Sequence, residues 1–180
     1  MSKEELVIWV DHDNNELGKV PRDLVHDKNH LMLHRETMEL LFRDKEHTEF
    51  LLQKRSSNKE QFPNRWTLTA TCHVNPVDIT IDDPEGFLNS GARESIEEVG
   101  VMAKNQKLIC IKPIETPLNR AMAGVIVGEY DGIPIADPKE VSEIRLFNRE
   151  TVLEIKDQLT PGALICLVLL GILQNEEKTK

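Results

Sequence analysis

Two segments of the chain, 84–99 and 160–174, are patterned as helices, whereas most of the remaining sequence is patterned as short strands. Asp82 or Asp83 supplies an N-cap for the first helix, a proline follows in its first turn, and Gly100 marks its end. A Thr-Pro pair opens the second helix in the same way. Helices and strands in this order bury their apolar faces when the helices cover a sheet. We therefore expect an α/β (α+β) fold, an α/β/α sandwich with a central mixed β-sheet.

The strand patterns are apolar or alternating runs bounded by turn formers. They comprise a pair around an Asn-Asn turn in 5–20, a hairpin with arms 36–42 and 49–55, a strand within 62–74, a pair at 107–115 and 122–130, and a strand at 142–148. A short helix or turn is expected in 21–30 and a helix near 149–157. No internal repeat or low-complexity linker appears, so we predict one domain over 1–180. It divides into an N-terminal extension (about 1–32), a core (about 33–158) and a C-terminal helix (about 160–174).

Length and charge limit the partners that this chain can have. Its 180 residues suit a single core, and the net charge of −9 argues against general binding to nucleic acids or to anionic membranes. A small anionic substrate is still compatible, because a local basic pocket or a bound cation reverses the sign. The apolar run 163–173 is too short to span a bilayer and is expected to be buried, with a homodimer face as the alternative.

The expected location is a reducing cytoplasm. Residues 1–11 lack the basic and apolar regions of a secretion signal. Cys72, Cys110 and Cys166 are widely spaced and odd in number, which fits neither a disulfide framework nor a zinc pattern.

The predicted helix 84–99 carries an unusual concentration of acid. Glu94, Glu97 and Glu98 are three and four positions apart, so they share one helical face, and Arg93 lies four residues before Glu97. Carboxylates on one face repel one another, and a hard divalent cation would relieve that repulsion. On charge alone, a solvated helix face is the alternative explanation.

The order of these residues is more specific than their charge. The sequence RESIEEVG, 93–100, with an apolar residue after it and Glu85 eight residues before Arg93, resembles the Nudix box. The flanking segments NNELGKVPRDLVH, LHRETMELLF, LLQKRSSNKEQFPNRWT, PKEVSEIRLF and LTPGALICLVL resemble the isopentenyl-diphosphate-isomerase-like branch of that family. This resemblance covers roughly residues 8–170. It implies a Nudix-type sandwich that hydrolyses a small-molecule diphosphate with Mg²⁺ or Mn²⁺.

The resemblance also assigns roles within the box. Glu97 and Glu98 would hold the cation, and Glu94 would ligate it or act as the base for the attacking water. Arg93 would orient the cluster by pairing with Glu97 or with Glu85. Glu85 and Gly100 would be structural.

Basic residues outside the box match positions that meet the diphosphate in this branch. These are Arg55 and Lys59, for which an exposed basic loop is the alternative. Glu140 and Glu143 are candidates for a further carboxylate, although both also fit an acidic surface.

The chain departs from the box beside its expected metal site. His73 takes the place of the usual glycine, and about six extra residues lie within 74–83. His73 is a candidate further metal ligand, with a hydrogen-bonded loop histidine as the alternative. The inserted loop is expected to reshape the pocket and to influence which substrate fits.

A true isomerase of this branch would need a reactive cysteine, two histidines upstream and acids on a later strand. His34, with His26 or His30, offers the histidines, but the cysteine position falls on Thr71 and the strand 119–127 carries no acid. Cys72 is one position away, which turns its side chain to the opposite face of a strand. Isomerase activity is therefore the second hypothesis, and a non-catalytic Nudix binding module is the third.

Overall fold

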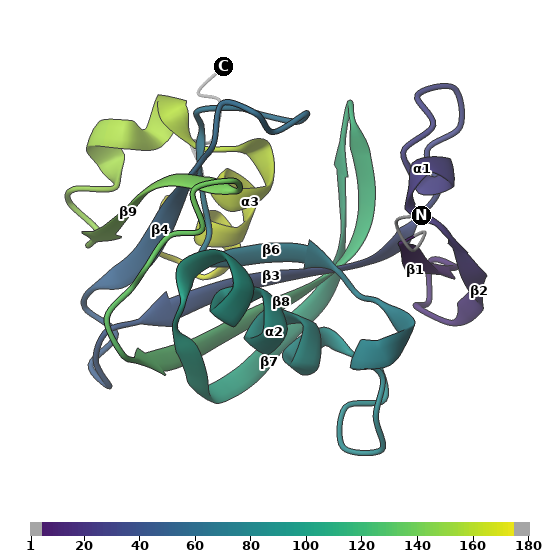
Figure 1. Cartoon of the computed structure of the whole chain (residues 1–180), viewed down its shortest axis with the longest axis horizontal. Coiled ribbons are helices and arrows are strands. Elements are labelled where there is room, and N and C mark those ends of the chain that lie inside the picture. Colours follow the sequence, from purple (N-terminus) through teal and green to yellow (C-terminus); the bar gives the residue numbers. More distant parts are fainter. Residues whose placement is uncertain (1–4, 175–180) are drawn as a thin grey trace.

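The computed structural model describes residues 5–174 and has the expected sandwich, with α2 and α3 on opposite faces of a mixed sheet (Figure 1). The strands are β1 (Leu6–Val10), β2 (Glu16–Pro21), β3 (His34–Phe42), β4 (Phe50–Arg55), β5 (Trp66–Thr67), β6 (Ala70–His73), β7 (Met102–Thr116), β8 (Asn119–Asp131) and β9 (Val141–Phe147). The helices are α1 (Arg22–Val25), α2 (Phe87–Val99) and α3 (Pro161–Leu169), with 3₁₀ turns η1 (Pro76–Asp78) and η2 (Leu153–Gln158).

β3 is the central strand of the molecule. It runs parallel to β8 on one side and antiparallel to β6 on the other, and β7 extends the sheet beyond β8. β4 pairs with β5 and β9 and meets β3 only where Phe42 faces Phe50. The predicted hairpin over 36–55 was therefore wrong for most of its length, because β6 and β8 occupy both hydrogen-bonding edges of β3.

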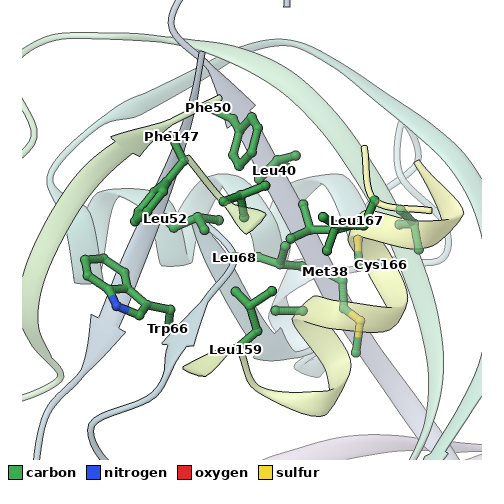
Figure 2. Close-up of a cluster of buried hydrophobic side chains, with 14 of the residues drawn as sticks. Met38, Leu40, Phe50, Leu52, Trp66, Leu68, Phe147, Leu159, Cys166 and Leu167 are labelled. Carbon is green, nitrogen blue, oxygen red and sulfur yellow. The ribbon is translucent and has the colours of Figure 1, made fainter. Parts of the chain in front are cut away.

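The alternation of side chains along β3 explains why a helix lies on each face. Met38 and Leu40 point to the α3 side and pack in the core with Cys166 and Leu167 (Figure 2). On the other face, the hydroxyl of Thr37 donates a hydrogen bond of 3.0 Å to the carbonyl of Phe87 at the start of α2. One strand thus places the two helices.

The ends of α2 differ in how well local sequence predicts them. Gly100 ends the helix in the left-handed conformation, at φ 68°, as predicted. The predicted start at 84 was wrong, because Gly86 adopts φ 79° and the helix begins at Phe87. Asp83 still serves this end of the helix, since its carboxylate accepts a hydrogen bond of 2.8 Å from the backbone of Asn89.

Other predicted elements were correct in place but wrong in extent. The segment 62–74 divides into β5 and β6, and the predicted helix at 149–157 is the 3₁₀ turn η2. The C-terminal helix ends at Leu169, earlier than 174, and its N-cap is confirmed because the Thr160 side chain accepts a hydrogen bond from the backbone of Ala163. Leu169 is half-exposed, and a dimer through this helix stays a prediction. No helix in 5–174 is long and apolar enough to cross a bilayer.

Candidate active site

A cavity of about 770 Å³ gathers most of the predicted site residues. Its lining comes from β3, β6, α2, the end of β4 with the loop after it, the loop before β9 and the N-terminal segment, with further residues from β5, β7, β8 and α3. Predicted residues that line it are Arg55, Lys59, His73, Arg93, Glu94, Glu97, Glu98 and Glu140. Glu85 and Glu143 are absent from its lining, and Glu143 forms an ion pair with Arg145.

Glu98 is the most enclosed carboxylate of the box, with 6% of its surface exposed. Gln53, from β4, donates a hydrogen bond of 2.5 Å to it, and the Lys59 ammonium lies 3.7 Å away. Burial raises the pKa of Glu98, and these two partners oppose that rise. The helix face is therefore not simply solvated.

Glu94 lies in the cavity wall, whereas Glu97 lies at the more exposed rim. Burial, together with the nearby Glu98 and Glu97 carboxylates, raises the pKa of Glu94 to about 8. Arg93 limits this rise, because its Nη1 donates to Glu94 at 2.9 Å and to Glu97 at 3.2 Å. The predicted Arg93–Glu97 pair is confirmed.

Arg93 was predicted to pair with Glu97 or with Glu85, and Glu97 is the partner of the two that the structure shows. The Nε and Nη2 of Arg93 donate to the two carboxylate oxygens of Asp78, at 3.0 and 3.1 Å. Glu85 instead accepts a hydrogen bond of 2.7 Å from Asn14. Asp78 belongs to the inserted loop, so local sequence gave no reason to join it to Arg93.

The basic side of the cavity comes from the end of β4, which carries Arg55, and from the loop after it, which carries Lys59. Lys59 forms an ion pair with Glu140, which brings that acid to the cavity rim. Arg55 is half-buried, and its Nε donates to the carbonyl of Gln61 at 2.9 Å. Two cations therefore share one cavity with the box carboxylates, which suits a substrate that is itself an anion.

Three histidines form a second cluster, and two of them, His26 and His73, line the same cavity. Within 5–174, the one group of three or more His, Cys, Asp or Glu side chains whose ligand atoms all lie within 4.8 Å is His26, His34 and His73. The Nε2 atoms of His26 and His73 are 2.8 Å apart. Of the two upstream candidates, the structure thus selects His26 over His30.

Two of these imidazoles, those of His26 and His34, are in the form that binds a metal. Burial lowers the pKa of His26 to about 4 and that of His34 to about 3, so both rings are neutral near pH 7. The Nδ1 of His34 donates to the carbonyl of Met32 at 2.9 Å, which leaves its Nε2 with a free lone pair. That Nε2 and the Nδ1 of His26 are buried and unpartnered among the described residues. Neutral imidazoles of this kind suit a transition-metal ion rather than Mg²⁺.

Glu36 is a further acid that the sequence analysis did not assign to the cavity. It lies on β3 two residues after His34, and it accepts a hydrogen bond of 2.8 Å from Asn119. Burial raises its pKa. His34 and Glu36 are two polar residues on a face of β3 that is otherwise apolar, and this pattern was the signal that could have revealed Glu36.

The side chain of Cys72 points where the strand alternation predicted. Its sulfur contacts the carbonyl of Ser90 on α2 at 3.5 Å, and burial raises the pKa of this thiol well above its usual value. Thr71 and His73, its neighbours on β6, are partly exposed. A buried thiol of raised pKa is a poor nucleophile.

Comparisons with known proteins agree with this geometry. No model of a known protein family matches the chain. An uncharacterised Nudix hydrolase of Pseudomonas aeruginosa is 29% identical over 157 residues, which cover 85% of this chain and 84% of that protein. An isopentenyl-diphosphate Delta-isomerase II of Clarkia xantiana is 30% identical over 144 residues, 73% of this chain. The chain spans about half the length of this isomerase, since the match covers 49% of it.

Solved structures share the fold at lower identity. The DR0079 protein of Deinococcus radiodurans aligns with a TM-score of 0.62 and 20% identity, covering 83% of this chain and 87% of that one. A MutT Nudix hydrolase of Burkholderia pseudomallei aligns with a TM-score of 0.55 and 20% identity, covering 75% and 95%. In its fold, in its box on α2 and in its relatives in sequence, the chain is similar to proteins of the Nudix superfamily.

Proposed function

We propose that the chain hydrolyses a diphosphate linkage in a nucleoside diphosphate derivative or similar small molecule, by attack of water at phosphorus. The observation that carries this proposal is the meeting of Glu94 and Glu98 with Arg55 and Lys59 in one cavity. Cationic side chains are suited to hold a diphosphate, and neighbouring carboxylates are suited to a divalent cation.

Glu94, Glu97 and Glu98 are the residues that would hold Mg²⁺ or Mn²⁺. They fit such an ion because carboxylate oxygens are its preferred ligands. Burial and the neighbouring Glu98 and Glu97 carboxylates raise the pKa of Glu94, and a bound cation would offset that rise. When bound, the ion neutralises phosphate oxygens and lowers the pKa of a bound water.

The side chains of the cavity would bind the substrate, accept a proton and hold the carboxylates in place. Arg55 and Lys59 bind and orient the diphosphate. Glu94, once deprotonated, accepts the proton of the attacking water. Arg93 holds Glu94 and Glu97 at fixed positions through Nη1. His73 would be a further metal ligand, through the histidine cluster rather than through the box carboxylates.

A panel assay tests the proposal. The protein is incubated with Mg²⁺ and nucleoside diphosphate derivatives, dinucleoside polyphosphates or isopentenyl diphosphate, and the phosphate products and isomers are measured. Glu97→Gln and Glu98→Gln should each lower kcat on the order of 100-fold, since each removes charge that the transition state needs. Glu143→Gln is the matched control, because that carboxylate pairs with Arg145 and lies outside the cavity lining. Turnover that survives both box substitutions would refute the proposed site.

The histidine cluster favours isopentenyl-diphosphate isomerisation as the second candidate. Two histidines of the cluster, His26 and His73, line one cavity together with the acid of Glu36, and several relatives carry that name. Thr71 stands where a thiol would be needed, so the proton donor is missing from β6. Isomer formation from isopentenyl diphosphate, lost in His26→Ala, would reverse the order of the two hypotheses. Binding across the panel without any turnover would instead favour a non-catalytic module.

We also propose a reducing cytoplasm as the setting. Cys72, Cys110 and Cys166 are all free thiols, and two of them are buried. A thiol count after purification without reductant, with all three thiols titrated once the chain is unfolded, would support this location.

A further inference from the structure

We propose that Asp78, in the inserted loop 74–83, is the positioning residue for Arg93 and through it for Glu94 and Glu97. This inference rests on the proposed hydrolysis, because its consequence is the geometry of the box carboxylates. The resemblance implied that Arg93 orients the cluster by pairing with Glu97 or with Glu85. Asp78, in the inserted loop, is a further partner that holds Arg93 itself.

The contact between Asp78 and Arg93 is a two-point contact. Nε and Nη2 donate to separate oxygens of the same carboxylate, at 3.0 and 3.1 Å. The guanidinium is planar and rigid, so fixing one edge also fixes the direction of Nη1. That third nitrogen donates to Glu94 and Glu97, which would otherwise repel each other. A change at Asp78 is therefore passed to both carboxylates.

Asp78 is itself held rigidly. It is 4% exposed, and its Oδ2 accepts a second hydrogen bond, of 2.8 Å, from the backbone of Asn75. The side chain of Asn89, on α2, donates to the carbonyl of Asp78 at 2.8 Å. The loop also packs closely, since a Cβ built on Gly86 would lie 2.6 Å from Val74. A residue fixed by its own turn and by the helix is suited to orient another.

The carboxylate of Glu85 is hydrogen-bonded to Asn14 instead of to Arg93. Asn14, in the turn between β1 and β2, donates a hydrogen bond of 2.7 Å to it. Arg35 joins the same group by donating to Asn14 and to the backbone carbonyl of Glu85. Glu85 thus fastens the N-terminal hairpin to the loop and leaves Arg93 to Asp78.

The experiment compares Asp78→Asn with Glu85→Gln, two substitutions that remove one charge at nearly constant shape. For a substrate found in the panel, Asp78→Asn should lower kcat by about 10- to 100-fold, as for partners that orient metal ligands, while KM changes less than about threefold. Glu85→Gln should stay within about threefold of the unchanged protein. Both are assayed well below their unfolding temperatures, followed by circular dichroism.

A double-substitution cycle tests whether Asp78 acts through Arg93. Arg93→Lys keeps the charge but cannot make the two-point contact. If the inference is right, Asp78→Asn combined with Arg93→Lys loses no more than Arg93→Lys alone, because the two changes break one interaction. A merely structural effect of the loop would add to the loss. Asp78→Glu keeps the charge, so its kcat should lie between that of Asp78→Asn and that of the unchanged protein. If Asp78→Asn does not fold, Asp78→Glu takes its place in the cycle.

Mn²⁺ titration followed by electron paramagnetic resonance gives a second readout that needs no turnover. Mn²⁺ bound at the box carboxylates is identified as the binding that is lost in Glu97→Gln. Mn²⁺ bound at the histidine cluster is not lost in that variant, so the two sites can be told apart. Asp78→Asn should raise the Mn²⁺ Kd at the box carboxylates by about 10-fold or more, and Glu85→Gln should not. Unchanged kcat and Kd in Asp78→Asn, with an active parent protein, would overturn this inference alone. A parent protein with neither turnover nor Mn²⁺ binding at the box carboxylates would overturn the proposed function and the inference with it.

Discussion

Binding of Mg²⁺ to the box should release a proton from Glu94. The pKa of this carboxyl is raised to about 8, chiefly by burial and by the charge of Glu98. With that value, about nine in ten Glu94 side chains are protonated at pH 7 and about one in ten at pH 9. A cation requires the ionised form, so its binding should release about 0.9 proton from Glu94 at pH 7 and about 0.1 at pH 9. The apparent affinity should rise by about 50-fold between pH 6 and pH 8.

Isothermal titration calorimetry in buffers of different ionisation enthalpy measures the protons released. Mg²⁺ is the suitable probe because it avoids imidazole, and because His26 and His34 are already neutral at pH 7 and have no proton to release. The pKa of Glu98 is also raised, and any proton that it releases adds to the total. Glu94→Gln should therefore lower the count by about 0.9 proton at pH 7.

The sign of the effect on folding gives an independent check. The pKa of Glu94 is 4.5 in its ordinary range and about 8 in the folded protein, so between these two pH values the folded state binds more protons than the unfolded state. The folded protein therefore becomes less stable as the pH rises from 4.5 toward 8. Without Mg²⁺, the stability of the unchanged protein relative to Glu94→Gln should fall over that range, and Mg²⁺ should restore it. Equal proton release by the two proteins at pH 7 would refute the reasoning.

Three further predictions concern the scaffold and the histidines. Gly124→Ala should destabilise the protein by about 1–3 kcal/mol in urea unfolding, because the new Cβ would lie 2.4 Å from the buried ring of Phe87. Gly18→Ala is the control, and it should change the stability little because the nearest atom to its new Cβ is 3.8 Å away. Thr160→Ala should cost about 1 kcal/mol through loss of the α3 N-cap bond, and an unchanged urea midpoint would contradict that role. Burial lowers the pKa of His34 from 6.5 to about 3, so between these pH values the unfolded chain binds a proton at His34 that the folded protein does not. The contribution of His34 to folding stability is therefore complete above pH 6.5 and is lost as the pH falls toward 3. The stability of the unchanged protein relative to His34→Asn should therefore decrease from pH 7 to pH 5, and a constant difference would count against a neutral buried ring.

Short-range pattern was sufficient for much of the fold. Turn formers between apolar runs predicted the β7–β8 pair and β9, and a glycine after the acidic run predicted the end of α2. Strand alternation also predicted that Cys72 would point away from the face of Thr71. These features depend on neighbours within a few residues, so the sequence carries them directly.

The extents of elements were less predictable because tertiary contacts decide them. α2 begins at Phe87 rather than at 84 because loop 74–83 folds against that end of the helix. Asn89 donates hydrogen bonds to the carboxylate of Asp83 and to the carbonyl of Asp78, both in this loop. The expected hairpin of β3 with β4 gave way because a central strand is shared between β6 and β8.

The site shows the same division. The sequence by itself determined that Glu94, Glu97 and Glu98 share a helical face with Arg93, since their spacing fixes it. Only the tertiary structure decided that Arg93 would be held by Asp78 and that Glu36 would join the cavity. It likewise brought three histidines together from separate segments, because contacts between residues far apart in the chain depend on how the whole sheet is assembled.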